Sequence, residues 1–369
     1  MASQQPFVFR WGIISTGHIA TCFVKDALLD PRTRGVHDVV HKVTAVGSRS
    51  VENAQKFIDA VAGGDPSIKA HGSYAGVFAD PNVDGVYIGT PHTYHYLNAV
   101  DAIKAKKHIL VEKPATSNLA ELRSLLALAK EHGVFLMEAM WTRFQPVALA
   151  VRSIIDEGSL GAPVMIHADL SHDFDLENIP KSHRILDPHL GGGAILDLGP
   201  YPLVWAIIAL YEYPSNKNSA PIVTSSLVKT PLTGVDANTA FTLTFPAIPA
   251  QALLSCNINI PGSGGPGATL RFRNGNIIIP SPLFLPKSYT VQWFDRPGSG
   301  VVQREETVKV DIVGGGWHYQ ADEVARCVRD GKTQSEVWGH DKSLLAMKIF
   351  DEVRRQGDYV LPEGVEQVL

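Results

Sequence analysis

The chain has 369 residues, a length that predicts two or three domains and a core large enough to fold without disulfides or metals. Hydrophobic residues make up 45% and charged residues 19%, which excludes a largely disordered chain. With 33 basic and 37 acidic side chains the net charge is −4, so the charge balance favours neither nucleic acid nor an anionic membrane as a partner.

The sequence shows no targeting or membrane segment. The N-terminus lacks the basic and apolar regions of a signal peptide, and no run of about 18 apolar residues predicts a membrane span. Cys22, Cys256 and Cys327 lie far apart without a C-x-x-C pair, which is typical of reduced thiols. We therefore expect a cytoplasmic protein.

Residues 1–143 alternate between strand and helix patterns. Apolar runs predict buried strands at 7–14, 43–47, 83–89, 109–111 and 134–137. Between these strands, apolar residues recur with helical spacing at 19–28, 54–61, 97–103 and 118–129. Asn118 and Glu121 predict a capping box at the start of the last of these helices. This alternation is typical of βαβ units and a parallel sheet.

Residues 144–369 form a second predicted domain with another pattern. Between about 164 and 310 the apolar residues recur mostly with period two, broken by Gly- and Pro-rich stretches, which predicts an extended antiparallel or mixed sheet. Helical spacing returns at 321–328 and 344–353. We expect these closing helices, near 318–356, to pack back on the first domain.

A glycine loop follows the first predicted strand. The dinucleotide fingerprint G-x-G-x-x-G/A has its second glycine at Gly17 and its last position at Ala20, while Ser15 replaces the first glycine. A side chain at Gly17 would keep a pyrophosphate from the helix N-terminus. The loop therefore predicts a dinucleotide site, with cofactor contacts from Ser15, Thr16, Gly17, His18 and Ile19. The alternative is an ordinary βα turn.

The end of the second strand bears on the choice of cofactor. NAD sites usually carry Asp or Glu there, to bind the ribose hydroxyls. This strand instead ends in Ser48 and Arg49, and an arginine can pair with a 2′-phosphate. We predict NADP rather than NAD, with a solvated surface arginine as the alternative.

Two further loops follow later strands. The spacing of His92 and His95 invites a metal, but no third ligand lies nearby, so we expect none. Thr90, Pro91, His92 and His95 are predicted instead to contact the cofactor. Lys113 follows the strand at 109–111, where a side chain points into the ligand crevice of such a sheet; an exposed loop lysine is the alternative.

The last motif spans residues 191–201 and begins with three glycines. Asp197 and Tyr201 are four residues apart, so one helix through both would place them on one side. A tyrosine acting as a base near neutral pH needs a neighbouring cation, which Lys113 can supply. The alternative is a helix N-terminus with a buried capping network.

Together these motifs resemble the glucose–fructose oxidoreductase / inositol dehydrogenase family. The resemblance rests on the glycine loop, the triplet Glu112-Lys113-Pro114 and the run 191–201, in this order. The runs 137–144, 184–188 and 320–324 are similar to the dimeric dihydrodiol dehydrogenases and the fungal NADP-dependent D-xylose dehydrogenases. The resemblance covers nearly the whole chain.

The resemblance implies a fold and roles for several residues. The fold would be a Rossmann domain followed by an α/β domain with a large open, mainly antiparallel sheet that faces a second subunit, giving a homodimer. Lys113 and Tyr201 fall at catalytic positions and Asp197 at a substrate-hydroxyl position. Inositol dehydrogenases carry His in place of Tyr201, which argues against inositol. Apolar pocket positions match Trp141 and Phe174, and further cofactor contacts are expected from Glu112, Lys113, Trp141 and Arg184.

Three functions follow from these patterns. The favoured one is NADP-dependent oxidation of an aldose at its anomeric carbon, D-xylose to its lactone, with Tyr201 as general base assisted by Lys113. The second is oxidation of trans-dihydrodiols to catechols. The third is a non-catalytic NADP-binding regulator, which would have no need for Lys113, Asp197 and Tyr201 together.

Overall fold

The computed structural model describes residues 5–368, which form two compact units. Unit 1 contains residues 5–141, 312–344 and 366–368, and unit 2 contains residues 142–311 and 345–365. The first change of unit therefore lies close to the sequence-based boundary at 143. The chain then returns to unit 1 at Ile312, and the division between Leu344 and Leu345 lies inside helix α10 (His340–Gln356).

Unit 1 is built on a six-stranded sheet with the order β3-β2-β1-β4-β5-β6. Every neighbouring pair in it is parallel. The strands are β1 (Phe7–Ile14), β2 (Val39–Gly47), β3 (Lys69–His71), β4 (Gly85–Ile88), β5 (His108–Glu112) and β6 (Leu136–Ala139). This strand order is typical of dinucleotide-binding domains, whose ligands lie at the carboxyl ends of the strands.

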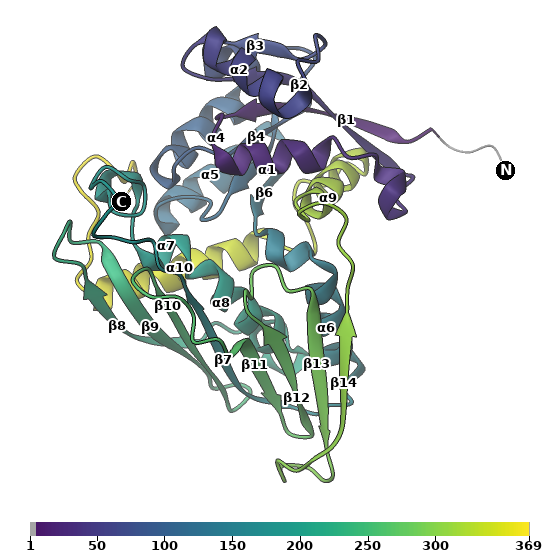
Figure 1. Cartoon of the computed structure of the whole chain (residues 1–369), viewed down its shortest axis with the longest axis vertical. Coiled ribbons are helices and arrows are strands. Elements are labelled where there is room, and N and C mark those ends of the chain that lie inside the picture. Colours follow the sequence, from purple (N-terminus) through teal and green to yellow (C-terminus); the bar gives the residue numbers. More distant parts are fainter. Residues whose placement is uncertain (1–4, 369) are drawn as a thin grey trace. The chain divides into compact units, whose positions relative to one another are not determined.

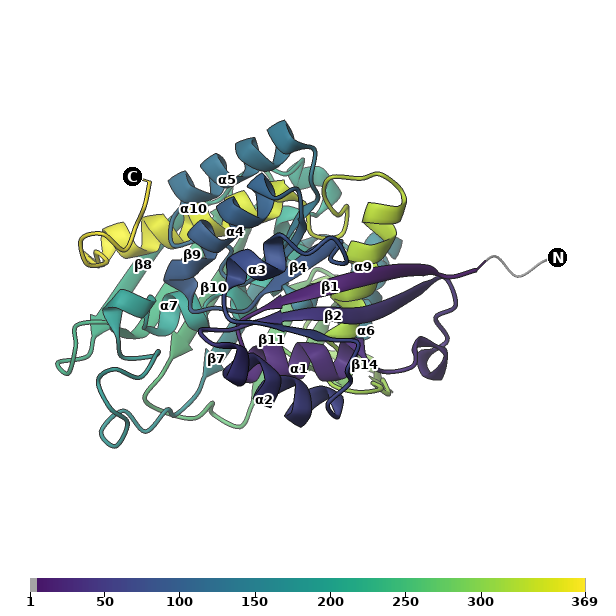
Figure 2. The ribbon, with the colours of Figure 1, turned by 90° about the horizontal axis from the view of Figure 1, so that it is seen from above.

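Helices cover both faces of this sheet. They are α1 (His18–Ala27), α2 (Val51–Ala62), α3 (Tyr74–Phe78), α4 (His95–Lys104), α5 (Leu119–His132) and α9 (His318–Arg329). Figure 2 shows α1 and α2 on one side of β1 and β2, and α3, α4 and α5 on the other. Asn118 Oδ1 accepts the Glu121 N–H at 2.8 Å, as the capping box predicts. The Glu121 carboxylate, however, accepts from Ser117 N (2.9 Å) rather than from Asn118.

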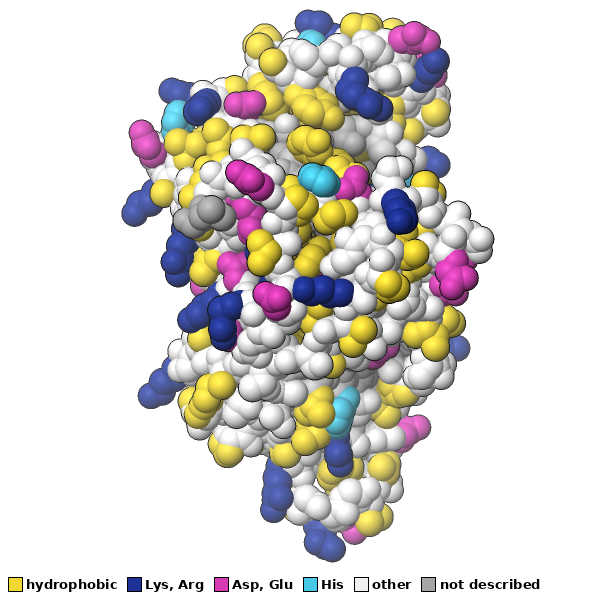
Figure 3. All heavy atoms as spheres, turned by 90° about the vertical axis from the view of Figure 1, so that its left-hand side faces the viewer, with side chains coloured by type: hydrophobic (Ala, Val, Ile, Leu, Met, Phe, Trp, Pro, Cys, Tyr) yellow, Lys and Arg dark blue, Asp and Glu magenta, His cyan; other side chains and the backbone are white. Residues whose placement is uncertain are grey.

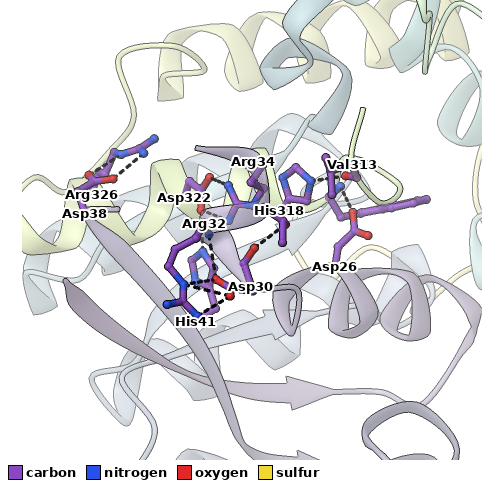
Figure 4. Close-up of polar contacts among 12 residues, drawn as sticks. Asp26, Asp30, Arg32, Arg34, Asp38, His41, Val313, His318, Asp322 and Arg326 are labelled. Carbon is purple, nitrogen blue, oxygen red and sulfur yellow. Dashed lines mark hydrogen bonds and ion pairs between the residues drawn. The ribbon is translucent and has the colours of Figure 1, made fainter. Parts of the chain in front are cut away.

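A buried polar network ties α9 to the N-terminal part of unit 1 (Figure 4). Asp322 forms an ion pair with Arg34, and His41 Nε2 lies 2.9 Å from the same carboxylate. Trp11 Nε1 donates to His41 Nδ1 at 3.1 Å. Nδ1 is therefore the acceptor nitrogen, and the proton of the neutral ring lies on Nε2, facing Asp322. These contacts explain why residues far along the chain fold with the first sheet.

Unit 2 contains an eight-stranded sheet with the order β14-β13-β12-β11-β7-β10-β9-β8 (Figure 1). Its strands are β7 (Pro163–Ser171), β8 (Ile222–Lys229), β9 (Asp236–Phe245), β10 (Ala250–Asn257), β11 (Pro266–Phe272), β12 (Gly275–Pro280), β13 (Ser288–Phe294) and β14 (Val302–Lys309). Strands β7 and β10 pair in parallel and the other neighbours are antiparallel. The prediction of a large, mainly antiparallel sheet is confirmed.

Helices of unit 2 pack against one face of this sheet. Helix α8 (Pro200–Ala206) contacts β7, β10 and β11, α7 (Ala194–Asp197) contacts β9 and β10, and α6 (Pro146–Glu157) contacts β13. The alternation of buried and accessible residues along β9 and β10 follows from this arrangement, since every second side chain points to the helices.

The helical turns between Pro188 and Tyr211 are apolar and long enough to cross a membrane by length and composition. In the structure 94% of their most apolar window is buried within the protein, so their composition is that of a core segment. They do not form the single helix through Asp197 and Tyr201 that the spacing predicts. The chain forms α7 and then α8, because Pro200 has no N–H to continue the hydrogen-bond pattern.

Acidic and basic side chains are interspersed with uncharged and apolar ones on the face drawn in Figure 3. This face carries no continuous stripe of one sign.

Candidate active site

The glycine loop joins β1 to α1 at the carboxyl end of the sheet. Ser15, which replaces the first glycine of the fingerprint, has φ of +100°, a conformation that glycine adopts far more readily. Gly17 is the N-cap of α1 and is exposed. A Cβ built on Gly17 would meet only Ser15 Oγ within 4 Å, at 3.5 Å. The protein itself therefore leaves room at Gly17, which fits a ligand that needs this space.

The loop is connected to the end of β2. Thr16 Oγ1 and Ser48 Oγ share a hydrogen bond of 3.3 Å, while Arg49 is exposed one residue further along. His18 and Ile19 are the first residues of α1. The structure thus brings the predicted cofactor residues of the first two strand ends to one edge of the sheet, with a cation where NAD-specific sites carry a carboxylate.

The loop after β4 contains Thr90, Pro91 and His92, and it leads to His95, the first residue of α4. His95 is fully buried, and its two ring nitrogens each lie 2.8 Å from a backbone carbonyl oxygen, those of Pro114 and Thr90. Burial lowers the pKa of His95 to about 4, against the effect of the two carbonyl groups. Both nitrogens face the backbone, so His95 connects the ends of β4 and β5 and is not placed to bind a metal. Among residues 5–368 no group of three or more His, Cys, Asp and Glu side chains has the arrangement of a metal site.

The end of β5 carries Glu112 and Lys113. Tyr87 donates its hydroxyl hydrogen to Glu112 Oε1 at 2.6 Å, and burial raises the pKa of Glu112 to about 7. Glu112 was predicted to contact the cofactor, and in the structure its carboxyl group is bound to Tyr87. Lys113 follows directly and is joined to Pro114, the residue whose carbonyl group contacts His95.

Glu138, which the sequence did not single out, supports the segment after Lys113. Its Oε1 accepts the Ala115 N–H at 3.0 Å, and its Oε2 accepts from Trp338 Nε1 (3.0 Å) and Ser343 Oγ (2.7 Å). A buried glutamate inside the apolar run 134–140 was the available signal. Trp141 lies just beyond β6 and stacks on Trp317, with ring centroids 4.4 Å apart and planes within 6°.

Unit 2 brings together three of the predicted residues. Arg184 forms an ion pair with Asp197 at 3.0 Å, and its guanidinium carbon lies 6.0 Å from the centroid of the Phe174 ring. Arg184 was predicted as a cofactor contact, and here it contacts the predicted substrate-binding carboxylate. Tyr201 lies on α8 with its ring centroid 5.4 Å from that of Phe284, an aromatic neighbour that the sequence did not reveal.

Comparison with known proteins assigns the family. Residues 9–140 match the family model described as an oxidoreductase family with an NAD-binding Rossmann fold (GFO/IDH/MocA), and residues 148–278 match the model of the GFO/IDH/MocA C-terminal domain. D-xylose 1-dehydrogenase (NADP(+)) of Hypocrea jecorina is 37% identical over 98% of this chain and 95% of its own length. The chain belongs to the GFO/IDH/MocA oxidoreductase family.

Other members of the GFO/IDH/MocA family are also similar. Trans-1,2-dihydrobenzene-1,2-diol dehydrogenase of Danio rerio is 31% identical over 94% of this chain and 96% of its own length. The solved structure of a levoglucosan dehydrogenase with NADH and levoglucosan superimposes with a TM-score of 0.82 at 17% identity, covering 95% of this chain and 97% of that one. A 3-ketoreductase from Actinomadura kijaniata gives 0.77 at 21% identity, covering 96% and 98%. The resemblance stated from the sequence is confirmed, including both of its branches.

Proposed function

We propose that the protein oxidises an aldose, with D-xylose as the favoured substrate, at the anomeric carbon and uses NADP⁺ as the acceptor. The observation that carries the proposal is the 37% identity to the fungal D-xylose 1-dehydrogenase over 98% of this chain. It is supported by the presence of Lys113, Asp197 and Tyr201 in one chain.

Features of unit 1 support NADP as the cofactor. Gly17 leaves space in front of the N-terminus of α1, which attracts phosphate groups. Ser48 and Arg49 stand at the end of β2, where a 2′-phosphate would lie. The fungal relative carries NADP(+) in its name. The nicotinamide supplies the hydride acceptor.

In the proposed mechanism Tyr201 takes the proton of the anomeric hydroxyl while the hydrogen on the anomeric carbon leaves with its electron pair. The C–O single bond becomes a carbonyl, and the product is the aldono-lactone. Lys113 would favour the ionised form of Tyr201, because a nearby cation stabilises a phenolate. Asp197 would orient another hydroxyl of the sugar by accepting its hydrogen bond. Arg184 Nη1 lies 3.0 Å from Asp197 Oδ1, and this ion pair orients the carboxylate.

Oxidation of trans-dihydrodiols is the second candidate. The vertebrate relatives that carry this activity in their names are about as long as this chain and 30–31% identical to it. Within unit 2, the aromatic rings of Phe174 and Phe284 lie near Arg184 and Tyr201, and they favour a flat, apolar substrate.

A substrate panel tests these proposals. Purified protein would be supplied with D-xylose, other aldopyranoses and trans-1,2-dihydrobenzene-1,2-diol, each with NADP⁺ or NAD⁺, and reduction of the nicotinamide would be followed by absorbance. The highest kcat/KM is expected with D-xylose and NADP⁺. A higher value with the diol would favour the second candidate. Tight NADP⁺ binding without turnover of any substrate would favour a non-catalytic regulator.

We also propose a homodimer that forms through the open face of the eight-stranded sheet. One row of paired residues on this face crosses all eight strands without an Asp, Glu, Lys or Arg: Thr224, Thr242, Leu253, His167, Thr269, Ile278, Thr290 and Thr307. An uncharged row of this length, running across the whole sheet, suits contact with a second copy of the chain. Leu253→Asp, at the middle of the row, should reduce the mass in sedimentation to that of one chain. Val360→Asp, at a residue 77% exposed, is the control and should leave the mass unchanged.

A further inference from the structure

The segment that carries Asp197 and Tyr201 begins with a turn of three glycines, Gly191 to Gly193. Gly193, the N-cap of α7, has φ of +110° and supplies no side chain to cap the helix. Helix α7 has only four residues, so its amide groups at the N-terminus need partners from elsewhere. Asp197 is the last residue of this short helix, so partners at its N-terminus lie within one turn of Asp197.

Asp236, the first residue of β9, supplies the missing partner. Its Oδ2 accepts the Ile195 N–H at 2.7 Å and the Thr239 hydroxyl at 2.7 Å. The side chain is fully buried, and burial raises the pKa of Asp236 to about 7, against the lowering effect of these hydrogen bonds. Among the described residues Oδ1 has no hydrogen-bond partner, so the two contacts of Oδ2 fix the position of this buried carboxyl group.

The glycine turn fits closely against this carboxyl group. A Cβ on Gly193 would lie 2.0 Å from Asp236 Oδ1, and a Cβ on Gly192 would lie 2.7 Å from the carbonyl oxygen of Ile185. Tyr359 donates its hydroxyl hydrogen to the Gly192 carbonyl oxygen at 3.0 Å. The turn is therefore confined by residues far apart in the sequence.

A series of backbone hydrogen bonds connects the start of α7 to Tyr201. The Ala194 carbonyl accepts from Leu198 N at 2.8 Å and from Gly199 N at 3.1 Å. The Leu198 carbonyl then accepts from Tyr201 N at 3.1 Å. Gly199 permits this close path, since a Cβ there would lie 2.3 Å from the Ile195 carbonyl oxygen. A shift of Ile195 would therefore be passed on to both Asp197 and Tyr201.

We propose that Asp236 is a positioning residue for the reaction, which holds the glycine turn and α7 so that Asp197 and Tyr201 are presented in a fixed arrangement. The inference rests on the proposed function for the roles of these two residues. Asp236 contacts neither substrate nor cofactor in this scheme and acts through the backbone of residues 193–201.

The test compares Asp236→Ala, Asp236→Asn and Gly193→Ala with the wild type. Asp236→Ala removes the acceptor for Ile195, so kcat should fall by roughly 10²-fold, the usual effect of an ångström-scale misplacement, while KM for NADP⁺ stays unchanged. Asp236→Asn keeps an oxygen that can accept from Ile195 and Thr239 and should restore most of the activity. Gly193→Ala should resemble Asp236→Ala, because its Cβ displaces the carboxyl group.

A structural readout accompanies the kinetics. Hydrogen exchange of the backbone amides in residues 191–201 should accelerate in Asp236→Ala and Gly193→Ala, with no change in the β1–α1 segment. Asn216→Ala is the matched control: it removes a buried side chain of unit 2 that donates to the Tyr211 and Ser219 carbonyl groups, away from the turn. It should lower stability without changing kcat or this exchange.

Two results would overturn the proposal. One is a folded Asp236→Ala protein with wild-type kcat and with exchange in 191–201 no faster than in Asn216→Ala. The other is equal loss of kcat in Asp236→Ala and Asn216→Ala, which would indicate general destabilisation. Failure of the wild type to oxidise any sugar or diol would instead refute the proposed function, and the exchange measurement would still decide whether Asp236 holds the turn.

Discussion

The candidate site residues of unit 1 and those of unit 2 are held in place in different ways. In unit 1 the glycine loop follows its strand directly, and its local geometry comes from contacts between near neighbours, such as Ser15 Oγ accepting from Gly17 N at 3.3 Å. In unit 2 the residues of α7 depend on Asp236, 41 residues further along, and the Gly192 carbonyl depends on Tyr359, 167 residues away. A glycine loop can thus be recognised from a short run of sequence, whereas the positions of Asp197 and Tyr201 depend on the whole fold of their unit.

The largest effect should come from removing one hydroxyl group in unit 2. Tyr201→Phe is expected to reduce kcat by about 10²–10⁴-fold, the usual contribution of a positioned acid–base group. NADP⁺ binding, measured by fluorescence titration, should be unchanged, because the proposed cofactor loop lies in unit 1. Loss of NADP⁺ affinity in this variant would contradict the division of roles between the two units.

Lys113→Met tests whether Lys113 favours the ionised form of Tyr201, as proposed. It keeps the length of the side chain and removes its charge, so kcat should fall, and the pH at which activity rises as Tyr201 ionises should move upward. The double variant should lose much less than the product of the two single effects, since residues that act as a unit are not additive. Independent, multiplicative losses would show that Lys113 and Tyr201 act separately.

The reverse experiment changes only the proposed cofactor loop in unit 1. Gly17→Val should abolish dinucleotide binding, because its methyl groups would occupy the place of the pyrophosphate. The melting temperature should change little, since a Cβ at Gly17 meets only Ser15 Oγ, at 3.5 Å. Calorimetric titration with NADP⁺ and a thermal melt measure the two quantities. A folded variant that still binds NADP⁺ tightly would show that the loop does not hold the pyrophosphate.

Most of unit 1 could be predicted from the sequence, because its signals are local. Strand β1 coincides with its predicted range, and the predicted strands at 83–89, 109–111 and 134–137 overlap β4, β5 and β6. The start of β2 at Val39 and the short strand β3 were missed, since polar residues interrupt their apolar pattern. The large mixed sheet was predicted, but its parallel pair of β7 and β10 depends on contacts across about 80 residues of chain, which no local period encodes.

The candidate site could be predicted only in part. The residues proposed to carry the chemistry, Lys113, Asp197 and Tyr201, were chosen through their motifs, and their roles stay predictions. Residues that support them were not found, because Glu138 and Asp236 are identified by burial and by hydrogen bonds to distant backbone groups. The single helix that would place Asp197 and Tyr201 on one side does not form, since Pro200 begins a new helix. The capping network named as its alternative is present at the N-terminus of α7, where Asp236 provides it.

A smaller effect should follow from changing the cofactor preference. Arg49→Ala removes a charge-assisted contact to the 2′-phosphate, worth about 1.5–3 kcal/mol, so KM for NADP⁺ should rise by about ten-fold or more. KM for NAD⁺ should change little, because that cofactor has no phosphate at this position. Steady-state kinetics with both cofactors measure the ratio. Equal losses for the two cofactors would show that Arg49 does not distinguish them.

The smallest effect on turnover is expected from a substitution in the polar network that attaches α9 to the first sheet. The same substitution should lower the stability of the protein strongly. Asp322→Asn leaves the buried guanidinium of Arg34 without its ionic partner, which typically costs about 3–5 kcal/mol. The melting temperature should fall, while kcat and both KM values, measured well below it, should stay at wild-type values. The network contains none of the residues proposed to contact substrate or cofactor. A large loss of kcat in the folded variant would show that it also acts on the site.

The dependence on pH sharpens this prediction. Burial alone would raise the pKa of Asp322, but hydrogen bonds from His41 and Arg34 outweigh burial and lower it. A carboxyl group with a lowered pKa in the folded state stabilises the protein above its unfolded pKa, and this stabilisation is lost as the pH falls through the folded value. The difference in melting temperature between the wild type and Asp322→Asn should therefore be constant near neutral pH and shrink in acid. A difference that stays constant down to strongly acidic pH would mean that the carboxylate charge does not stabilise α9 against the sheet.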